Sequence, residues 1–354
     1  MCISEQLKDQ KKPNLFKFAT KELSQDAFFA WLFSWADPLL KNLDLNLHNT
    51  SVKLIRRIVH KDNLTIEKIE VKRQLNNIDI VLLINDEIII AIEDKTYTKS
   101  HNDQLNRYKK FIEEESEYKN FIKFFIYIKT RNESKYSLNE NVEKKGFEVI
   151  SRSYILEILK DNKSDNAIFK DYYDYLFEIE ERTNKNIKNF KADWEACEGF
   201  YMKIEEEIFN NNEEEKYFFD WGYVPNKRGG FLSLWQVNGF WLENIDEYYY
   251  IVFENYLNGK AQLVLKVADN NMTTQKLYEI LDLIKKLNSN NGLNIKKPEK
   301  YRAGRCSTLA IIDEKIGENI EDVDKIIESF ILKYKKGIDF IENLAEHRRK
   351  NMIG

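Results

Sequence analysis

Residues 77–108 read NIDIVLLI-NDE-IIIAIEDK-TYTKSHND-QLNRY, and this stretch decides the fold. It contains two strongly apolar runs, each typical of a buried strand. Both carry acids where such a strand normally has none: Asp79 lies inside the first run, and Glu93 and Asp94 close the second. A charge in an apolar strand costs free energy unless it is paired or binds a metal ion. These acids therefore mark a candidate site.

The two runs are predicted to form a hairpin, and the length of its turn decides which acids meet. Side chains alternate between the two faces of a strand, and directly opposed residues of a hairpin share a face. A three-residue turn over 85–87 places Asp79 opposite Glu93, with Lys95 on the same face and Asp94 on the other. A two-residue turn would send Asp79 and Glu93 to opposite faces. We favour the three-residue turn, because it leaves the other members of each face apolar.

This register predicts a metal site. Two opposed carboxylates lie about 5 Å apart. They repel one another, and one would stay protonated unless a cation lay between them. A hard divalent ion such as Mg²⁺, with Mn²⁺ as the alternative, is bound by carboxylate oxygens. Lys95, one pleat beyond Glu93, would point toward whatever the metal binds.

The pattern resembles that of the PD-(D/E)XK nuclease superfamily. Asp79, thirteen intervening residues and then Glu93-Asp94-Lys95 are similar to its D…(D/E)xK motif, although Ile rather than Pro precedes Asp79. Gln104 and Tyr108 are similar to the QxxxY element of its RecB-like branch. Residues 22–32 resemble the opening helix of bacterial members. The resemblance covers residues 15–150 approximately.

The resemblance implies an α/β fold with a restriction-endonuclease-like core of order αβββαβ, in which helices flank a mixed central sheet. It also implies a metal-dependent nuclease that hydrolyses phosphodiester bonds of nucleic acid, with DNA favoured. Asp79, Glu93 and the backbone carbonyl of Asp94 would hold one or two Mg²⁺ ions. Lys95 would orient the attacking water or stabilise the transition state.

Three further residues are assigned by the same resemblance. Gln104 and Tyr108 would fix the metal ligands or hold the DNA backbone. Glu22 has two interpretations of equal weight: it favours the start of a helix, or it is an outer metal ligand.

Two rival interpretations remain open. In the first, Glu93 and Lys95 form a solvent-facing ion pair of little energetic value, which does not explain Asp79. In the second, the chain keeps the nuclease fold but serves as a nucleic-acid-binding or assembly module. The near-neutral charge, 55 Lys and Arg against 59 Asp and Glu, favours the second interpretation, because many nucleic-acid-binding proteins have a basic excess.

Composition limits the class of protein. Hydrophobic residues make up 43% of 354, which indicates a globular chain long enough for two domains. Three scattered cysteines suggest no disulfide framework, and the polar N-terminus is unlike a signal peptide, so we expect a cytoplasmic protein without a membrane span. A homodimer is compatible with this composition. Walker-type, GxSxG and zinc-binding motifs are missing from the sequence, which leaves nucleotide hydrolysis, esterase and zinc chemistry unsupported.

Periodicity predicts the order of elements. Helical spacing runs from Lys21 to Asp37, with Ser24 as a candidate cap, and a second helix is expected over 54–60. A helix over 100–116 and a crossover to a parallel strand should follow the meander. The predicted strands are Ile66–Gln74, Ile78–Ile84 and Ile88–Glu93 in the meander, then Phe121–Ile128 and an edge strand at Phe147–Ile150.

The predicted domains are 1–190, nuclease-like, and 191–354, an α+β domain of unknown role. The second has strand patterns at 231–237, 249–253 and 262–267, followed by helices. Its basic segments, Lys296–Arg305 and His347–Lys350, could contact a phosphate backbone, and the aromatic side chains of Tyr248–Tyr250 could stack on bases. We favour the simpler interpretation, in which the aromatics are core and the basic side chains are solvated.

Overall fold

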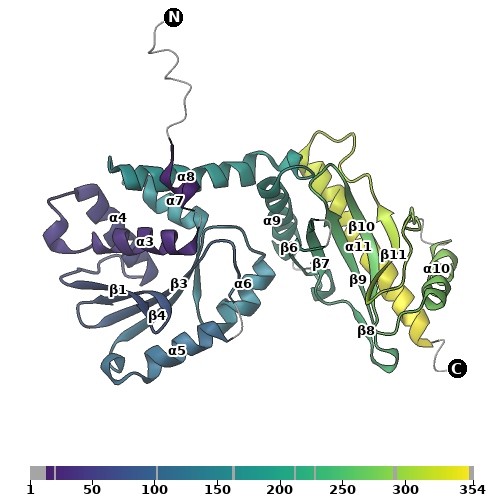
Figure 1. Cartoon of the computed structure of the whole chain (residues 1–354), viewed down its shortest axis with the longest axis horizontal. Coiled ribbons are helices and arrows are strands. Elements are labelled where there is room, and N and C mark those ends of the chain that lie inside the picture. Colours follow the sequence, from purple (N-terminus) through teal and green to yellow (C-terminus); the bar gives the residue numbers. More distant parts are fainter. Residues whose placement is uncertain are drawn as a thin grey trace, which may run out of the picture. The chain divides into compact units, whose positions relative to one another are not determined.

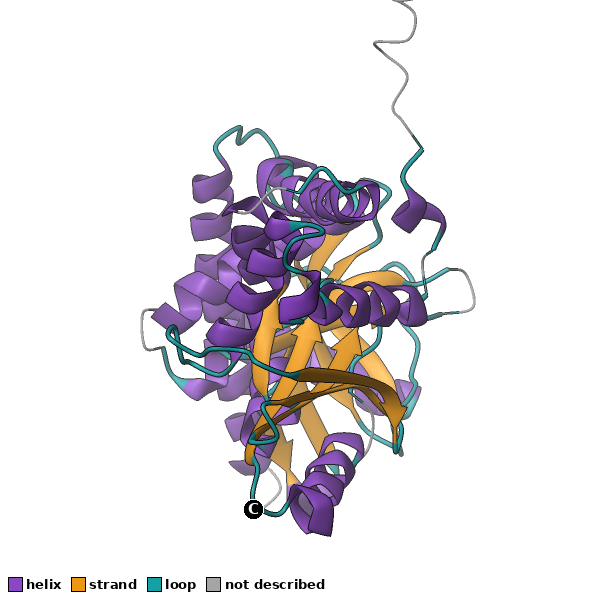
Figure 2. Ribbon diagram, turned by 90° about the vertical axis from the view of Figure 1, so that its left-hand side faces the viewer, coloured by secondary structure: helices purple, strands orange, loops and turns teal. Residues whose placement is uncertain are grey.

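The computed structural model describes residues 13–19, 21–100, 103–161, 164–210, 213–226, 229–289 and 293–350. The chain divides into two compact units, Met1–Glu133 with Ser137–Glu181 and Ser134–Tyr136 with Arg182–Gly354. Figure 1 labels the elements, and Figure 2 shows the strands in orange flanked by helices in purple.

The first unit contains a five-stranded mixed sheet in the order β1-β2-β3-β4-β5. Its strands are β1 (Ile69–Leu75), β2 (Ile78–Ile84), β3 (Ile88–Lys95), β4 (Ile122–Lys129) and β5 (Glu148–Ser151). Ile84 pairs with Ile88 across the β2–β3 turn, so the predicted three-residue turn is confirmed. β4 runs parallel to β3, as the predicted crossover requires, and β5 runs parallel to β4.

Helices cover both faces of this sheet (Figure 1). Alternate residues of β2 and β3 explain why: Ile80, Leu82 and Ile90 belong to a core with α3, α4, α7 and α8, whereas Val81 and Ile89 pack with α5. The sheet is therefore buried on both sides, as its continuous apolar runs indicate. The helices are α2 (Leu15–Phe18), α3 (Glu22–Ser34), α4 (Leu45–Ile58), α5 (Gln104–Glu114), α6 (Lys135–Asn141), α7 (Arg152–Asp161) and α8 (Ala167–Lys185).

Two local predictions are wrong. α3 begins at Glu22 with Lys21 as its N-cap and without a side-chain cap bond, so Ser24 lies inside the helix instead of capping it. α4 begins at Leu45, nine residues before the predicted start, because the Asp44 carboxylate accepts the backbone N–H of Leu47 and opens the helix there.

The second unit contains a larger sheet, with strands in the order β11-β10-β9-β7-β6 and β8 paired to β9. Its strands are β6 (Phe219–Val224), β7 (Phe231–Gln236), β8 (Phe240–Leu242), β9 (Glu247–Asn255), β10 (Ala261–Ala268) and β11 (Cys306–Asp313). The helices are α9 (Trp194–Asn210), α10 (Thr274–Asn288) and α11 (Val323–Lys350). One core joins α9, α10 and α11 to one face of this sheet. β6 and β8 were not predicted from the sequence.

Short 3₁₀ helices complete the connections: η1 (Pro38–Leu40), η2 (Ser116–Tyr118), η3 (Glu143–Lys145), η4 (Ile187–Asn189), η5 (Glu215–Tyr217) and η6 (Glu243–Ile245). The whole is a mixed α/β chain. Its first sheet, flanked by helices, is consistent with the expected restriction-endonuclease-like core, and a second sheet with a long helix follows.

Candidate active site

The β2–β3 hairpin brings the predicted acids together. Ile80 pairs with Ile92, so the next positions outward, Asp79 and Glu93, oppose one another on the α5 face of the sheet. Both oxygens of Asp79 are held: Oδ2 accepts the backbone N–H of Asp94 at 2.9 Å, and Oδ1 accepts Nε2 of Gln74 at 3.2 Å. These two bonds fix the Asp79 carboxylate beside Glu93.

Glu93 is the unusual group of this site. It is fully buried; Nζ of Lys95 lies against its Oε1, whereas its Oε2 has no hydrogen-bond partner among the described residues. Burial, and then the charge of Asp79, raise the pKa of Glu93 to about 8, although Lys95 opposes the rise. A buried carboxyl oxygen without a donor is costly to maintain. Its presence indicates a ligand that the protein binds there.

Lys95 lies on the same face as Glu93, as the strand parity predicts. Its Nζ is 2.5 Å from Oε1 of Glu93 and 3.7 Å from Oε2 of Glu22, the first residue of α3. Burial lowers the pKa of Lys95, but the nearby carboxylates outweigh it and raise the pKa above its ordinary value. The side chain is only 8% exposed and stays a fixed cation at the site.

Gln104 and Tyr108 lie one helical turn apart on α5. Nε2 of Gln104 donates to the Tyr108 hydroxyl oxygen at 2.7 Å. Burial raises the pKa of Tyr108, and the charges of Glu93 and Asp79 raise it further, which places this hydroxyl within electrostatic reach of the two acids. The structure therefore gathers all seven residues singled out from the sequence at one end of the first sheet. Asp94 contributes its backbone there and directs its side chain to the opposite face.

A comparison with protein-family models agrees with this geometry. The model described as the PD-(D/E)XK nuclease superfamily matches residues 13–198, more than half of the chain. The chain belongs to this superfamily. Searches of curated proteins and of solved structures give no match. Members of the superfamily are generally nucleases and typically use divalent metal ions, and their substrates are nucleic acids.

The donor set fits such an ion. Asp79 and Glu93 offer hard carboxylate oxygens, and Oε2 of Glu93 lacks any other partner within the described ranges. Across these same ranges, no group of three or more His, Cys, Asp or Glu side chains is arranged to hold a metal. A superfamily-type ion would therefore rest on two side chains, with the Asp94 carbonyl, water or the substrate phosphate as further ligands.

The opposite face of β3 carries a second acid pair that sequence reasoning missed. Asp94 is fully buried, and its Oδ1 accepts Nε2 of Gln25 at 2.5 Å. The carboxyl group of Asp26 neighbours that of Asp94 on this face. Burial raises the pKa of Asp26 to about 6 and that of Asp94 well above its ordinary value, and the neighbouring acid raises the pKa of Asp94 further. This pair attaches α3 to the strand that carries the nuclease motif.

Lys129 is another residue that the sequence did not single out. It pairs with Lys95 in the parallel register and is 4% exposed. Its Nζ donates to the carbonyl of Thr98 at 2.6 Å and lies 3.1 Å from Oε2 of Glu133. The Thr98 hydroxyl in turn donates to Oε1 of Glu22 at 2.5 Å. Lys129 thus positions the segment after β3, and through it the carboxylate of Glu22.

In the part of the chain that the structure describes, none of the helices has both the length and the apolar character needed to cross a bilayer.

Proposed function

We propose that this protein is a metal-dependent nuclease that hydrolyses phosphodiester bonds, with DNA as the favoured substrate and Mg²⁺ as the favoured ion. The observation that carries the proposal is the buried carboxyl group of Glu93, opposed to Asp79, contacted by Lys95 at Oε1 and left without a hydrogen-bond donor at Oε2 among the described residues. A fold retained only for assembly has no use for two acids in this arrangement, because they repel and destabilise it.

Each side chain has a task in this mechanism. When bound, the ion would activate a water molecule and neutralise charge on the scissile phosphate. Asp79 and Glu93 would hold the ion, and Glu93 must release its proton to do so. Lys95, fixed beside Glu93, supplies a positive charge for the water or for the charge that develops on phosphorus oxygens. Gln104 and Tyr108 provide donors on the α5 side.

The test compares cleavage by the parent chain with cleavage by Asp79→Asn and Lys95→Ala. Substrates are linear duplex, circular duplex and single-stranded DNA, together with RNA, each with Mg²⁺, Mn²⁺ or EDTA. We expect cleavage only with a divalent ion, and a loss of at least about a hundredfold in either variant. Glu70→Gln, an exposed acid of β1, should cut like the parent.

Equal cleavage by the parent and both site variants would show that the site is misassigned. The alternative function, a catalytically silent nucleic-acid-binding or assembly module, predicts instead that no substrate is cut. Thermal melting separates the two: a divalent ion should raise the melting temperature of the parent but not that of Asp79→Asn.

A further inference from the structure

Residues Lys296–Arg305, KKPEKYRAGR, form a basic strip in a chain whose net charge is −4. The strip contains five basic residues and one acid. Its basic side chains, Lys296, Lys297, Lys300, Arg302 and Arg305, are all exposed. Positive charge of this density on an otherwise acidic chain needs a partner of opposite charge.

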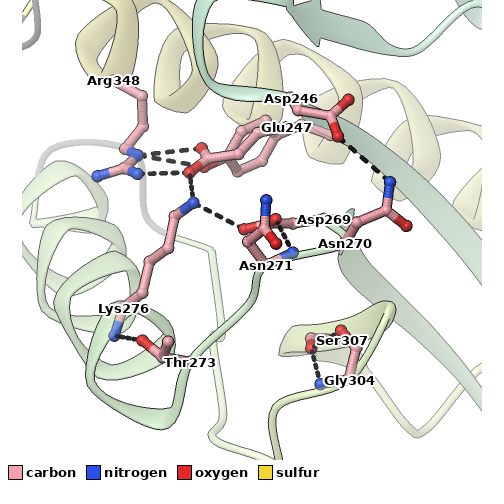
Figure 3. A network of polar contacts seen from close by, with 11 residues as sticks. Asp246, Glu247, Asp269, Asn270, Asn271, Thr273, Lys276, Gly304, Ser307 and Arg348 are labelled. Atoms are coloured by element: carbon pink, nitrogen blue, oxygen red, sulfur yellow. Dashed lines mark hydrogen bonds and ion pairs between the residues drawn. The ribbon is translucent and has the colours of Figure 1, made fainter.

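Backbone bonds hold the strip in place at both ends. At its start, Lys296 exchanges two backbone hydrogen bonds of 2.8 Å with Ile311 of β11. At its end, the Ser307 hydroxyl bonds both to the N–H and to the carbonyl of Gly304, at 3.0 and 2.9 Å (Figure 3). The Arg305 carbonyl also accepts the N–H of Asp269 at 2.9 Å. The strip is therefore preorganised, which lowers the entropy lost when a ligand binds.

A buried ionic network adjoins the far end of the strip (Figure 3). Glu247 and Asp269 are both buried acids. Lys276 lies 2.7 Å from each, and Arg348 lies 2.7 Å from Glu247. The two cations neutralise the two acids, so the field outside is set by the exposed basic side chains.

The same network bears on the other predicted nucleic-acid contacts of the C-terminal unit, the basic segment His347–Lys350 and the aromatic segment Tyr248–Tyr250. Arg348, a member of the basic segment 347–350, donates hydrogen bonds to Glu247 and to the Tyr249 hydroxyl oxygen. Tyr249 is core, and the Tyr248 hydroxyl is engaged by the backbone of Gly239. Neither segment offers a free binding surface comparable to the basic strip.

Several acids close to the basic strip are paired with cations, whereas Glu299, inside the strip, makes no ion pair among the described residues. Glu314 binds Lys296, Glu254 lies 2.6 Å from Lys266, and Asp282 lies 2.9 Å from Lys285. Between the strip and β10 lies a groove of about 520 Å³, lined by four lysines, Lys260, Lys296, Lys297 and Lys300, and three acids, Glu254, Glu299 and Glu314, among others. Within the described ranges, Lys300, Arg302 and Arg305 make no ion pair with an acid.

We propose that the basic strip binds the phosphate backbone of a nucleic acid. Cations spaced along an extended segment and beside a groove match a polyanionic strand, and each cation that meets a phosphate releases a counterion. An anionic membrane is the other polyanionic surface, but no large apolar side chain is exposed between Lys296 and Arg305 to insert into one. The choice of nucleic acid rests on the proposed nuclease function, to which the basic strip adds a second contact with the substrate.

The test measures binding, without cleavage, by fluorescence anisotropy of the full chain in EDTA. The probes are labelled single-stranded and duplex DNA of mixed sequence, titrated at several salt concentrations. Lys300→Ala with Arg302→Ala should lower duplex affinity roughly sixtyfold at 0.1 M salt and reduce the salt slope by about 1.8, since each contact contributes about 0.9. The matched control, Lys188→Ala with Lys325→Ala, removes two exposed lysines elsewhere in the same unit and should bind like the parent.

The proposal is overturned if the strip variant binds both probes as tightly as the control, or if the parent binds neither. A third arm uses vesicles containing anionic phosphatidylglycerol; binding of the parent to vesicles but not to DNA would also overturn it. Because the assay excludes metal, DNA binding without any later cleavage would support the basic strip while refuting the proposed nuclease activity. If the parent cleaves DNA with a divalent ion but the strip variant binds DNA like the parent, the nuclease activity is supported and the basic strip is refuted.

Discussion

Replacing Glu93 by Gln should stabilise the metal-free protein above neutral pH. In the folded chain, burial and Asp79 raise the pKa of Glu93 from its ordinary 4.5 to about 8. Between these values the folded state keeps a proton that the unfolded state has lost, so the free energy of unfolding falls as pH rises. At about 1.4 kcal/mol per pH unit, the cost is about 3 kcal/mol at pH 7 and about 5 kcal/mol by pH 8. A glutamine side chain does not ionise, so the Glu93→Gln variant does not lose this free energy of unfolding as pH rises.

The assay is urea unfolding in EDTA at intervals from pH 4.5 to 8, with hydrogen exchange of peptides from β2 and β3 reporting on the first unit. The variant and the parent should have similar stability near pH 4.5 and diverge as pH rises. The Asp26–Asp94 pair is present in both proteins and does not affect the difference.

Glu70→Gln is the matched control, because it removes an exposed carboxylate from the same sheet. Its stability should follow that of the parent at every pH. Parallel pH profiles for Glu93→Gln and the parent would refute the reasoning, since they would mean that Glu93 is ionised at neutral pH without a metal.

Three further predictions follow from other contacts. Divalent-metal affinity should rise up to about tenfold per pH unit below pH 8, with proton release visible by calorimetry in buffers of different ionisation enthalpy, because binding must displace the Glu93 proton. Lys129→Met should destabilise the fold by about 3–5 kcal/mol in urea by leaving Glu133 buried and unpaired, and adding Glu133→Gln should restore much of this. Gly199→Ala would place Cβ 1.9 Å from a backbone oxygen and should cost about 3 kcal/mol or more in thermal unfolding, whereas Gly304→Ala, with open space around it, should be near neutral.

The sequence predicts the first sheet well because its signals are local. The apolar runs of β2 and β3 and the three-residue turn between them define the register, and parity then places Asp79, Glu93 and Lys95 on one face. The parallel partner β4 also follows from the chain order, since a helix joins it to β3.

What the sequence misses depends on contacts between distant segments. Asp26 is an ordinary residue for the first turns of a helix, and only the packing of α3 on β3 makes it a partner of Asp94. Lys129 ends its strand, where a lysine is usually solvated, yet it is buried against Thr98 and Glu133. β6 has a glycine in its interior and follows an acidic run, so its alternation is too weak to identify a strand without its partner β7.

The turn between β2 and β3 lies far from any chemistry, yet its length constrains how this protein can evolve. Most surface loops accept an added or deleted residue with little effect. Here, loss of one residue would shift β3 by one position against β2 whenever the turn keeps its three residues, turning Glu93 toward α3 and presenting Asp94 to Asp79. Homologues should therefore conserve the number of residues between Asp79 and Glu93, and should keep Asn, Asp or Gly at positions 85 and 86, where φ is 53° and 54°.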